Sequence, residues 1–328
     1  MKAIVLTKYG LPKYFELQEV VKPEPKDEEV LVKVHAVSIN SWDWEILIAR
    51  PFVNRIMVGL LKPTRIKILG CDITGQVAAV GKDVKQFQPG DAVFGDLSSS
   101  GWGGFAEFVC ANEKAWTLKP ASMTFEQAAA LPQAGLLALQ GLNYKGGIQP
   151  GQKVLINGAS GGVGTFAVQI AKSFGAEVTG VCSGGKMAMV RNLGAEHVID
   201  YTKEDFTLNG QCYDRILDVK GYHSIFDYKR ALIQRGVYVM AGGCSALINQ
   251  VMFLGPLISM TSSKKIGLLL HKANKGLDDL IKIVESGKVT PVIDKCFSLA
   301  EVPEAMQYFG DGRASGKVII TIEHHNNA

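Results

Sequence analysis

The feature that most constrains the fold is an alternation of strand and helix patterns that begins after residue 123. A short strand of buried type at 154–157 leads into a helix at 163–174, and the alternation continues to a strand at 237–241. Strands that alternate with helices are typical of βαβ units, which place the strands in a parallel sheet. We therefore expect an α/β fold with a doubly wound, Rossmann-type parallel sheet. The other expected elements are strands at 177–181, 197–199 and 215–219 and helices at 187–193 and 224–234.

The first 120 residues have a different texture. Short β-branched or aromatic runs at 2–6, 29–37, 74–80, 92–94 and 105–109 are separated by Pro, Gly and Asp, which favour turns. Near the other end, a helix is expected at 277–286 and a strand at 317–322. A chain of 328 residues is too long for one ordinary core. We divide it into a β-rich domain at 1–123, a dinucleotide-binding domain at 124–265 and a C-terminal segment at 266–328.

Composition excludes several classes of function. The net charge of +4 is modest, so we expect no nucleic-acid partner. The apolar run at the N-terminus is broken at once, and no stretch has the apolar length of a membrane helix, so we expect neither a secretory signal nor a membrane partner. The six cysteines are scattered, which argues against a disulfide framework and against a CxxC zinc site. A reducing cytoplasm is the expected location.

A glycine-rich loop at 157–164 (NGASGGVG) joins a strand to a helix. In dinucleotide-binding proteins such a loop brings backbone N–H groups and a helix N-terminus up to a pyrophosphate. Gly161 would then let the phosphate approach the backbone, and Gly164 would let the helix pack closely on the strand. Ser160, Gly162 and Val163 complete the expected cofactor-binding loop.

The same loop also satisfies GxSxG, the nucleophile elbow of α/β-hydrolases. In that alternative Ser160 attacks an ester, with Asp218 and His271 as acid and base. A long β-rich domain before the elbow suits a hydrolase poorly, and no HGGG-type oxyanion loop precedes it. We therefore favour the dinucleotide interpretation.

The strand after the loop ends near the position where an acidic residue usually binds the ribose of NADH. Here the chain has Ser183 and Lys186 instead of an acid. A serine and a lysine suit a 2′-phosphate, so this pair favours NADPH. The alternative is that Lys186 merely begins a solvated helix.

Seven short motifs, taken in order, resemble the zinc-independent quinone oxidoreductases, the zeta-crystallin-like branch of the medium-chain dehydrogenase/reductase superfamily. The resemblance covers essentially the whole chain. The motifs are VHAVSIN at 34–40, LGCDITG at 69–75, QPGDAV at 88–93, GGFAE at 103–107, LPQAG at 131–135, NGASGGVG at 157–164 and GKV at 316–318.

The resemblance implies a GroES-like catalytic domain, formed by the N-terminal segment and the returning C-terminal segment, together with a Rossmann domain and NADPH as cofactor. It places Tyr201 with Ser183 and Lys186 around the adenosine phosphate, and Asn40 near the nicotinamide. It also implies that Gly242 and Lys317 line the cofactor groove. A homodimer is the family expectation.

Zinc-dependent relatives carry their ligands in three stretches that here contain Asn40, Cys71 with Asp72, and Gln133. Cys71, Asp72 and Asp43 could in principle hold a metal, but a catalytic zinc ion needs three good ligands and usually a histidine. We therefore expect no bound metal, and we expect Cys71 to be a small buried residue.

Without zinc, hydride transfer to an already electrophilic small molecule is the most accessible chemistry. We expect an NADPH-dependent reductase of quinones or α,β-unsaturated carbonyls, in which Asn40 contacts substrate or nicotinamide and Asp43 or a water handles the proton. Trp42, Trp44 and Trp102 either form an apolar wall for a flat acceptor or pack in the core. The alternative function is an NADPH-binding structural or RNA-binding protein with little turnover. The natural acceptor does not follow from the sequence.

Two further segments give expectations. Residues 50–67 interleave apolar with basic side chains, which we interpret as a surface helix packed on its own domain. An amphipathic lid over the substrate cleft is one alternative, and a membrane-surface role is another. The C-terminal tail from His324 onward is expected to be frayed, with its two histidines solvated.

Overall fold

The computed structural model describes residues 1–324 of the 328. The chain divides into two compact units: one contains Met1–Gln133, Ala273–Lys275 and Ile293–Ala328, and the other Ala134–Lys272 and Gly276–Val292. The first division lies ten residues later than the expected boundary at 123/124, because helix α3 (Phe125–Ala130) packs on strands β3 and β4 of the first unit. The expected C-terminal segment is also divided, since 276–292, with helix α9, belongs to the second unit.

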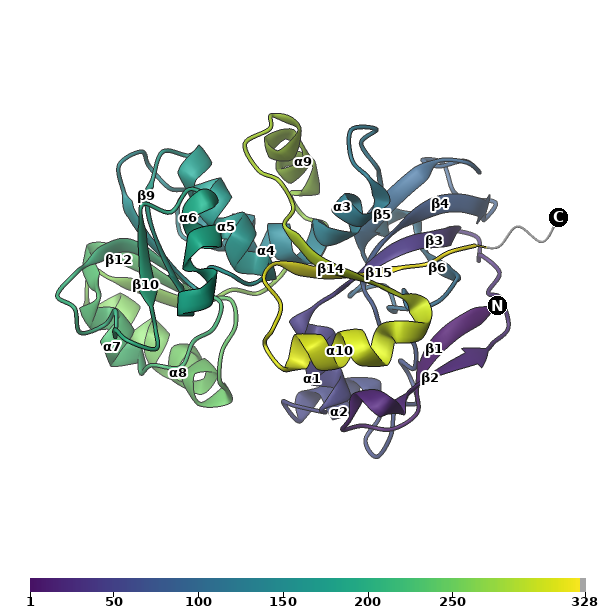
Figure 1. Cartoon of the computed structure of the whole chain (residues 1–328), viewed down its shortest axis with the longest axis horizontal. Helices are drawn as coiled ribbons and strands as arrows, with labels where there is room; N and C mark the ends of the chain where they lie inside the picture. The colour runs from purple at the N-terminus through teal and green to yellow at the C-terminus, as the bar shows by residue number, and fades with distance from the viewer. Residues whose placement is uncertain (325–328) are drawn as a thin grey trace. The chain divides into compact units, whose positions relative to one another are not determined.

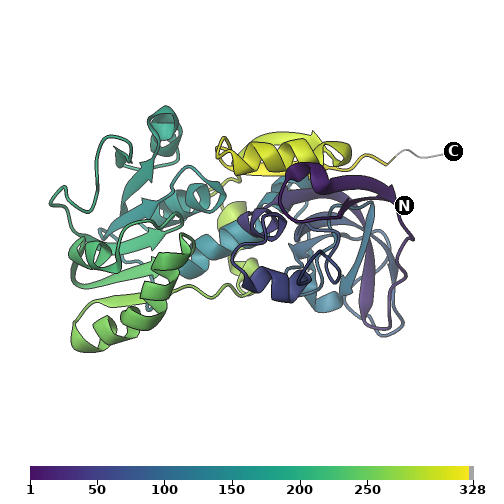
Figure 2. The same ribbon diagram turned by 90° about the horizontal axis from the view of Figure 1, so that it is seen from below.

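The second unit is built on a six-stranded parallel sheet in the order β10-β9-β8-β11-β12-β13. This is the strand order of a Rossmann fold, and it changes direction between β8 and β11. Helices α5 and α6 lie on one face of the sheet, and α7 and α8 lie on the other (Figure 2). The elements are α4 (Pro132–Leu142), β8 (Lys153–Asn157), α5 (Gly162–Ser173), β9 (Glu177–Cys182), α6 (Met187–Asn192), β10 (His197–Asp200), β11 (Tyr213–Asp218), α7 (Ile225–Arg230), β12 (Leu232–Met240), α8 (Ser245–Thr261), β13 (Lys265–Leu268) and α9 (Leu277–Glu285).

This unit differs from expectation in several elements, and neither α4 nor β13 was expected. The helix expected at 224–234 ends at Arg230, because Leu232 already pairs with Tyr213 as part of β12. Helix α8 was not predicted. Its 17 residues contain no charged side chain and include Pro256, so the sequence lacks the apolar stripe and polar face that mark an amphipathic helix.

The first unit contains a seven-stranded sheet in the order β14-β15-β3-β4-β5-β7, with β6 also paired to β3, and a separate pair, β1 and β2. All pairs are antiparallel except β14 with β15. Figure 1 shows β15, from the end of the chain, beside β3. The elements are β1 (Lys2–Leu6), β2 (Phe15–Glu19), β3 (Glu29–Ile39), α1 (Ser41–Leu47), α2 (Val53–Val58), β4 (Asp72–Val80), β5 (Ala92–Asp96), β6 (Phe108–Asn112), β7 (Thr117–Leu118), α3 (Phe125–Ala130), β14 (Ile293–Ser298), α10 (Val302–Gly310) and β15 (Lys317–Thr321).

Residues 50–67 do not pack as expected. Helix α2 turns the side chains of Asn54 and Val58 inward, while Phe52, Val53 and Ile56 are exposed. The expectation that the apolar side chains of this segment pack on their own domain is therefore wrong for most of them. The two large residues that follow, Leu60 and Leu61, are exposed as well.

Three smaller expectations can be compared with the structure. All six cysteines are free thiols. No helix among residues 1–324 is both long enough and apolar enough to span a bilayer. His324 is half-buried, with Nε2 2.7 Å from the carbonyl oxygen of Val34, so the expectation of a frayed, solvated residue is wrong for it. The remainder of the expected tail, from His325 onward, lies outside the described residues.

Candidate functional site

The glycine loop connects β8 to α5 at the carboxyl edge of the parallel sheet. Gly158 has a φ of +87°, which favours glycine. A Cβ atom on Gly164 would lie 2.1 Å from the carbonyl oxygen of Gly158, so a side chain there would push the helix off the loop. A Cβ on Gly161 would meet only that carbonyl, at 3.6 Å, which is an ordinary contact. Packing therefore explains glycine at 164 but not at 161.

The start of α5 is suited to an anion. Its N-cap residue, Gly161, has no side chain to accept a hydrogen bond from the first-turn N–H groups. Ser160, Gly162 and Val163 are each partly exposed around it. Free N–H groups and the positive end of the helix dipole favour a phosphate at this place. The loop thus fits the pyrophosphate of a dinucleotide.

The ends of β9 and β10 bring the expected adenosine-phosphate residues into one region. Asp200 is directly opposite Cys182 in the parallel pair, so Ser183 and Tyr201 follow neighbouring strand ends. The Tyr201 N–H also donates to the Cys182 carbonyl oxygen at 3.2 Å. Lys186 ends the short 3₁₀ turn that follows Ser183 and is partly exposed, while Tyr201 is 51% exposed.

An acidic residue that the sequence analysis did not consider holds this turn. The Asp200 carboxylate accepts hydrogen bonds from the hydroxyl and N–H of Thr202, at 2.7 and 3.0 Å. These bonds, together with a backbone bond from Gly184, keep the pKa of Asp200 below its usual value. The carboxylate is therefore ionised and engaged in shaping the turn that carries Ser183 and Lys186.

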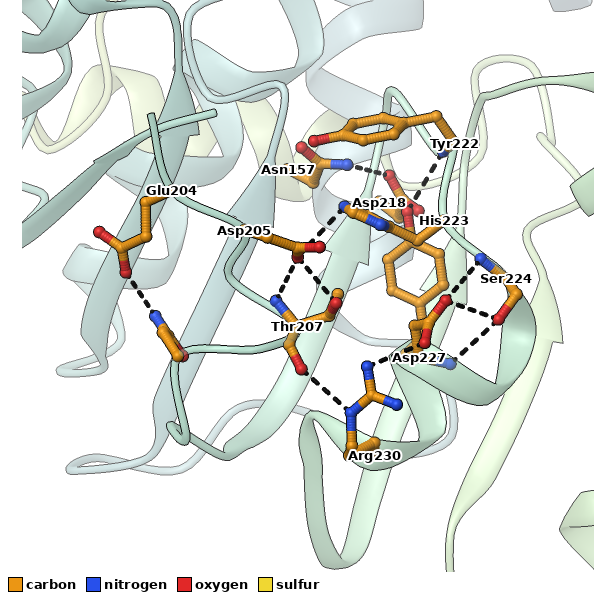
Figure 3. Close-up of polar contacts among 12 residues, drawn as sticks. Asn157, Glu204, Asp205, Thr207, Asp218, Tyr222, His223, Ser224, Asp227 and Arg230 are labelled. Carbon is orange, nitrogen blue, oxygen red and sulfur yellow. Dashed lines mark hydrogen bonds and ion pairs between the residues drawn. The ribbon is translucent and has the colours of Figure 1, made fainter. Parts of the chain in front are cut away.

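A buried carboxyl group lies at the end of β11, beside the glycine loop (Figure 3). Asp218 Oδ1 accepts from Asn157 Nδ2 at 2.9 Å, and Oδ2 accepts from the Tyr238 hydroxyl at 2.8 Å. Burial raises the pKa of Asp218 to about 6. Its Oδ1 also accepts from the Lys220 N–H at 3.2 Å, so the carboxyl group ties the turn after β11 to the sheet.

The turn after β11 packs against the loop that contains Gly242. The Gly221 N–H donates to the Gly242 carbonyl oxygen at 3.0 Å. A Cβ atom on Gly242 would lie 2.7 Å from the Val219 carbonyl oxygen. Close packing of the two loops accounts for glycine at 242, a residue the sequence analysis assigned to the cofactor groove.

Figure 3 also shows an aromatic and acidic cluster that the sequence analysis did not identify. The ring of His223 lies 4.2 Å from that of Tyr222, and its Nε2 is 3.6 Å from Asp205 Oδ1. Asp205 is in turn held by the hydroxyl and N–H of Thr207. No pattern in the sequence joins these residues, because they meet only when the loop before β11 folds against the turn after it.

The first unit contains a buried polar cluster around Lys317. The Lys317 ammonium donates to Asn40 Oδ1 at 2.5 Å and lies 3.8 Å from Asp72 Oδ2. Asn40 Nδ2 donates to the same Asp72 oxygen at 3.0 Å. Burial raises the pKa of Asp72 and lowers that of Lys317, and the attraction between the two opposes both shifts. The side chain of Lys317 is only 3% exposed.

The remaining stretches that would carry zinc ligands meet at the same cluster. The Gln133 N–H donates to Asp72 Oδ1 at 3.1 Å, and its Nε2 lies 3.5 Å from Cys71 Sγ. Ligand atoms of Cys71, Asp72 and Asp96 lie within 4.8 Å of one another. Burial and the nearby carboxylates raise the pKa of the Cys71 thiol well above its usual value, so the thiol is protonated. This group of ligand atoms includes no histidine, and the Lys317 ammonium lies 3.8 Å from Asp72 Oδ2, so the donor set fits zinc badly.

Asp43, expected as a possible proton carrier, closes the first turn of α1. Its Oδ2 accepts from the Asn40 N–H at 2.8 Å and its Oδ1 from the Gly70 N–H at 2.9 Å. Burial raises its pKa to about 7. Both oxygens are therefore used to join the Asn40 loop to the Gly70 loop.

The three tryptophans considered for an apolar wall all belong to the first unit and pack within it. Trp102 is 2% exposed and makes an edge-on contact with Trp42, with ring centres 5.4 Å apart. Trp42 and Trp44 are partly buried against the hydrophobic core of this unit.

Sequence and structure comparisons agree with this architecture. Residues 26–121 match the alcohol dehydrogenase GroES-like domain, and residues 193–320 match the zinc-binding dehydrogenase family. The chain is 34% identical to the chloroplastic quinone-oxidoreductase QR1 of Triphysaria versicolor, over 92% of each chain. The chain belongs to the quinone oxidoreductase family of the medium-chain dehydrogenase/reductase superfamily. This quinone oxidoreductase-like chain is also 33% identical to the mitochondrial NAD(P)H oxidoreductase RTN4IP1 of Bos taurus, over 98% of this chain and 89% of that one.

A solved structure shows the same fold over the full length. The quinone oxidoreductase from Coxiella burnetii superposes with a TM-score of 0.87 at 32% identity, covering 98% of this chain and 99% of that one. Membership in this family implies a nicotinamide cofactor. The hydrolase alternative requires Asp218 as the acid that orients a histidine. The Asp218 carboxyl group is instead bonded to Asn157 and Tyr238.

Proposed function

We propose that this protein is an NADPH-dependent reductase that transfers hydride to a quinone or an α,β-unsaturated carbonyl compound without zinc. The observation that carries the proposal is the buried Lys317 ammonium, which lies among Asn40 and Asp72 in the region where zinc-dependent relatives carry their ligands. A cation already occupies that region, so a metal ion would meet electrostatic repulsion there.

NADPH is proposed over NADH because of the groups at the ends of β9 and β10. Ser183 and Lys186 offer a hydroxyl and a cation to a 2′-phosphate, and Tyr201 lies on the neighbouring strand end. Two bonds from Thr202 hold Oδ1 of the nearby Asp200 in the turn, and the side chain is only 9% exposed, so it is poorly placed to accept from a ribose 2′-hydroxyl.

The proposed reaction requires the protein mainly to position the cofactor and the substrate. The nicotinamide supplies the hydride when the cofactor is bound. The Asn40 Oδ1 accepts from Lys317, and its Nδ2 donates to Asp72 and to Cys71 Sγ, so one lone pair of Oδ1 remains for a ligand. Both oxygens of Asp43 are engaged, and we propose that water supplies the proton.

Two further proposals concern the assembly of the protein and its turnover. A homodimer is proposed on the family resemblance, and β13 offers an edge of the parallel sheet for it. A role as an NADPH-binding protein with little turnover is the alternative function. Robust NADPH consumption with any quinone or enone would separate the enzyme from the binder.

The test is a titration of the purified protein with NADPH and NADH, in the presence of chelator, followed by nicotinamide fluorescence. We expect tight NADPH binding, weaker NADH binding, and NADPH oxidation when quinones or enones are added. Lys186→Gln should weaken NADPH binding roughly tenfold while leaving NADH binding nearly unchanged. The exposed Lys288→Gln is the matched control. Failure to bind either nucleotide would overturn the proposal.

A further inference from the structure

Residues 50–67, here called the basic apolar segment, have an unusual surface. The segment contains five basic side chains and no acidic one. Four of these, Arg50, Lys62, Arg65 and Lys67, are exposed. Five large apolar side chains are exposed among them: Phe52 (62%), Val53 (60%), Ile56 (59%), Leu60 (59%) and Leu61 (86%). Large apolar side chains that are exposed together within one short segment usually mark an interaction surface.

The outward direction of these side chains is fixed by contacts on the inner side. Asn54 is buried, accepts from Trp42 Nε1 at 3.4 Å and donates to the Arg50 carbonyl oxygen at 3.0 Å. The Tyr9 hydroxyl donates to the Gly59 carbonyl oxygen at 2.6 Å. Helix α2 therefore attaches to its unit through Asn54, Met57 and Val58, and presents Val53 and Ile56 to solvent. In Figure 1, α2 lies at the periphery of the first unit, beyond α1.

We propose that the basic apolar segment docks on the surface of an anionic lipid bilayer. Apolar side chains that insert at the level of the headgroups, flanked by Lys and Arg that pair with anionic lipids, are the combination that holds peripheral elements in the interface. The charge of the segment is complementary to such a surface along its whole length. This surface departs from the sequence expectation of no membrane partner.

The charges also argue against other occupants. A symmetric contact with a second copy would bring five positive charges against five more, with no acidic residue in the segment to balance them. Single-stranded nucleic acid is bound by aromatic side chains on which bases stack, whereas four of the five exposed apolar residues here are aliphatic.

Docking would bring the protein to the phase in which lipophilic quinones dissolve. That consequence rests on the proposed function, but the docking itself does not. A lipid-binding measurement therefore distinguishes failure of one proposal from failure of the other.

The experiment is co-sedimentation of the full-length protein with vesicles of phosphatidylcholine alone and with vesicles that also contain phosphatidylserine. We expect binding to the anionic vesicles only, weakened by added salt. Lys62→Gln with Lys67→Gln should lower the partition coefficient roughly fivefold per charge removed. Phe52→Ser with Leu61→Ser should lower it by at least roughly tenfold.

Matched controls separate this segment from the rest of the surface. Phe253, on α8, is 72% exposed, and Phe253→Ser should leave vesicle binding unchanged. The exposed pair Lys85→Gln with Lys288→Gln should have a much smaller effect than the segment pair. Circular dichroism and thermal unfolding would confirm that the variants are folded.

Absence of binding to anionic vesicles would overturn the proposal, as would equal binding to neutral ones. Loss of binding in Phe253→Ser but not in Phe52→Ser with Leu61→Ser would move the membrane contact to α8 and overturn it too. If the wild type does not bind vesicles, and the segment variants have a different sedimentation coefficient from the wild type, the basic apolar segment contacts a second copy of the chain instead.

Discussion

The ammonium group of Lys317 lies 3.8 Å from the carboxylate of Asp72, and the two side chains are 3% and 0% exposed. Breaking a buried ion pair by removing one partner costs about 3 to 5 kcal/mol, because the other charge is left without compensation. We therefore expect Lys317→Met to lower the free energy of unfolding by that amount at neutral pH, measured by urea denaturation.

A double-mutant cycle tests whether the pair itself is responsible. Lys317→Met with Asp72→Asn should lose much less than the sum of the two single variants, because neither charge is then left alone. The exposed Lys85→Met should change stability by less than about 0.5 kcal/mol. Additive losses in the cycle would show that Lys317 stabilises the unit through Asn40 or through packing instead.

Removal of metal should have no effect on activity. The Lys317 cation lies 3.8 Å from Asp72 Oδ2, and the ligand atoms of the cluster include no histidine, so the cluster has little affinity for zinc. We expect NADPH-dependent reduction to proceed at an unchanged rate after treatment with 1,10-phenanthroline. Metal analysis of the purified protein is the control, and a loss of rate restored by zinc would contradict the prediction.

The Lys317 cluster also shows what the sequence can and cannot predict. The strands and helices from β8 to β12 were predictable because each carries a local periodic pattern, and the glycine loop because its spacing is local. Asp72 and Lys317 lie near opposite ends of the chain and meet only because β15 pairs with β3 beside β4. Helix α8 was missed because its uniformly uncharged sequence gives no periodic pattern.

The sequence also did not determine which side chains of residues 50–67 are exposed. The interleaved apolar and basic residues at 50–67 fit a packed surface helix, a lid or a membrane contact equally well as a pattern. Burial of Asn54 and exposure of Ile56 exclude the packed surface helix, and both depend on how α2 is attached to Trp42 and Tyr9.

Asp218 should make stability depend on pH. Its pKa is raised from 3.8 to about 6 in the folded protein, so between these values the folded state holds a proton that the unfolded state has lost. Its contribution to the free energy of unfolding therefore falls as pH rises from about 4 to about 6, by up to about 1.4 kcal/mol per pH unit. Asp218→Asn should remove this part of the slope in urea denaturation.

The exposed Asp83 gives the matched control, because Asp83→Asn should leave the slope between pH 4 and 6 unchanged. The Asp218→Asn variant still contains Asp43, whose pKa is about 7. Its free energy of unfolding should therefore still fall as pH rises, up to neutral pH. An identical slope in the wild type and in Asp218→Asn would show that Asp218 titrates near its usual value.

Two glycines of the same loop should separate folding from cofactor binding. A Cβ on Gly164 would lie 2.1 Å from the Gly158 carbonyl oxygen, so Gly164→Ala should destabilise the protein by about 1 to 3 kcal/mol.

A Cβ on Gly161 would make an ordinary contact at 3.6 Å, and the backbone there, at φ −85° and ψ 177°, is open to alanine. Gly161→Ala should therefore keep its stability but obstruct a phosphate at the start of α5 and weaken NADPH binding at least tenfold. Thermal unfolding and the NADPH fluorescence titration measure the two effects separately. Unchanged NADPH affinity in a stable Gly161→Ala variant would mean that the pyrophosphate does not approach the backbone at this glycine.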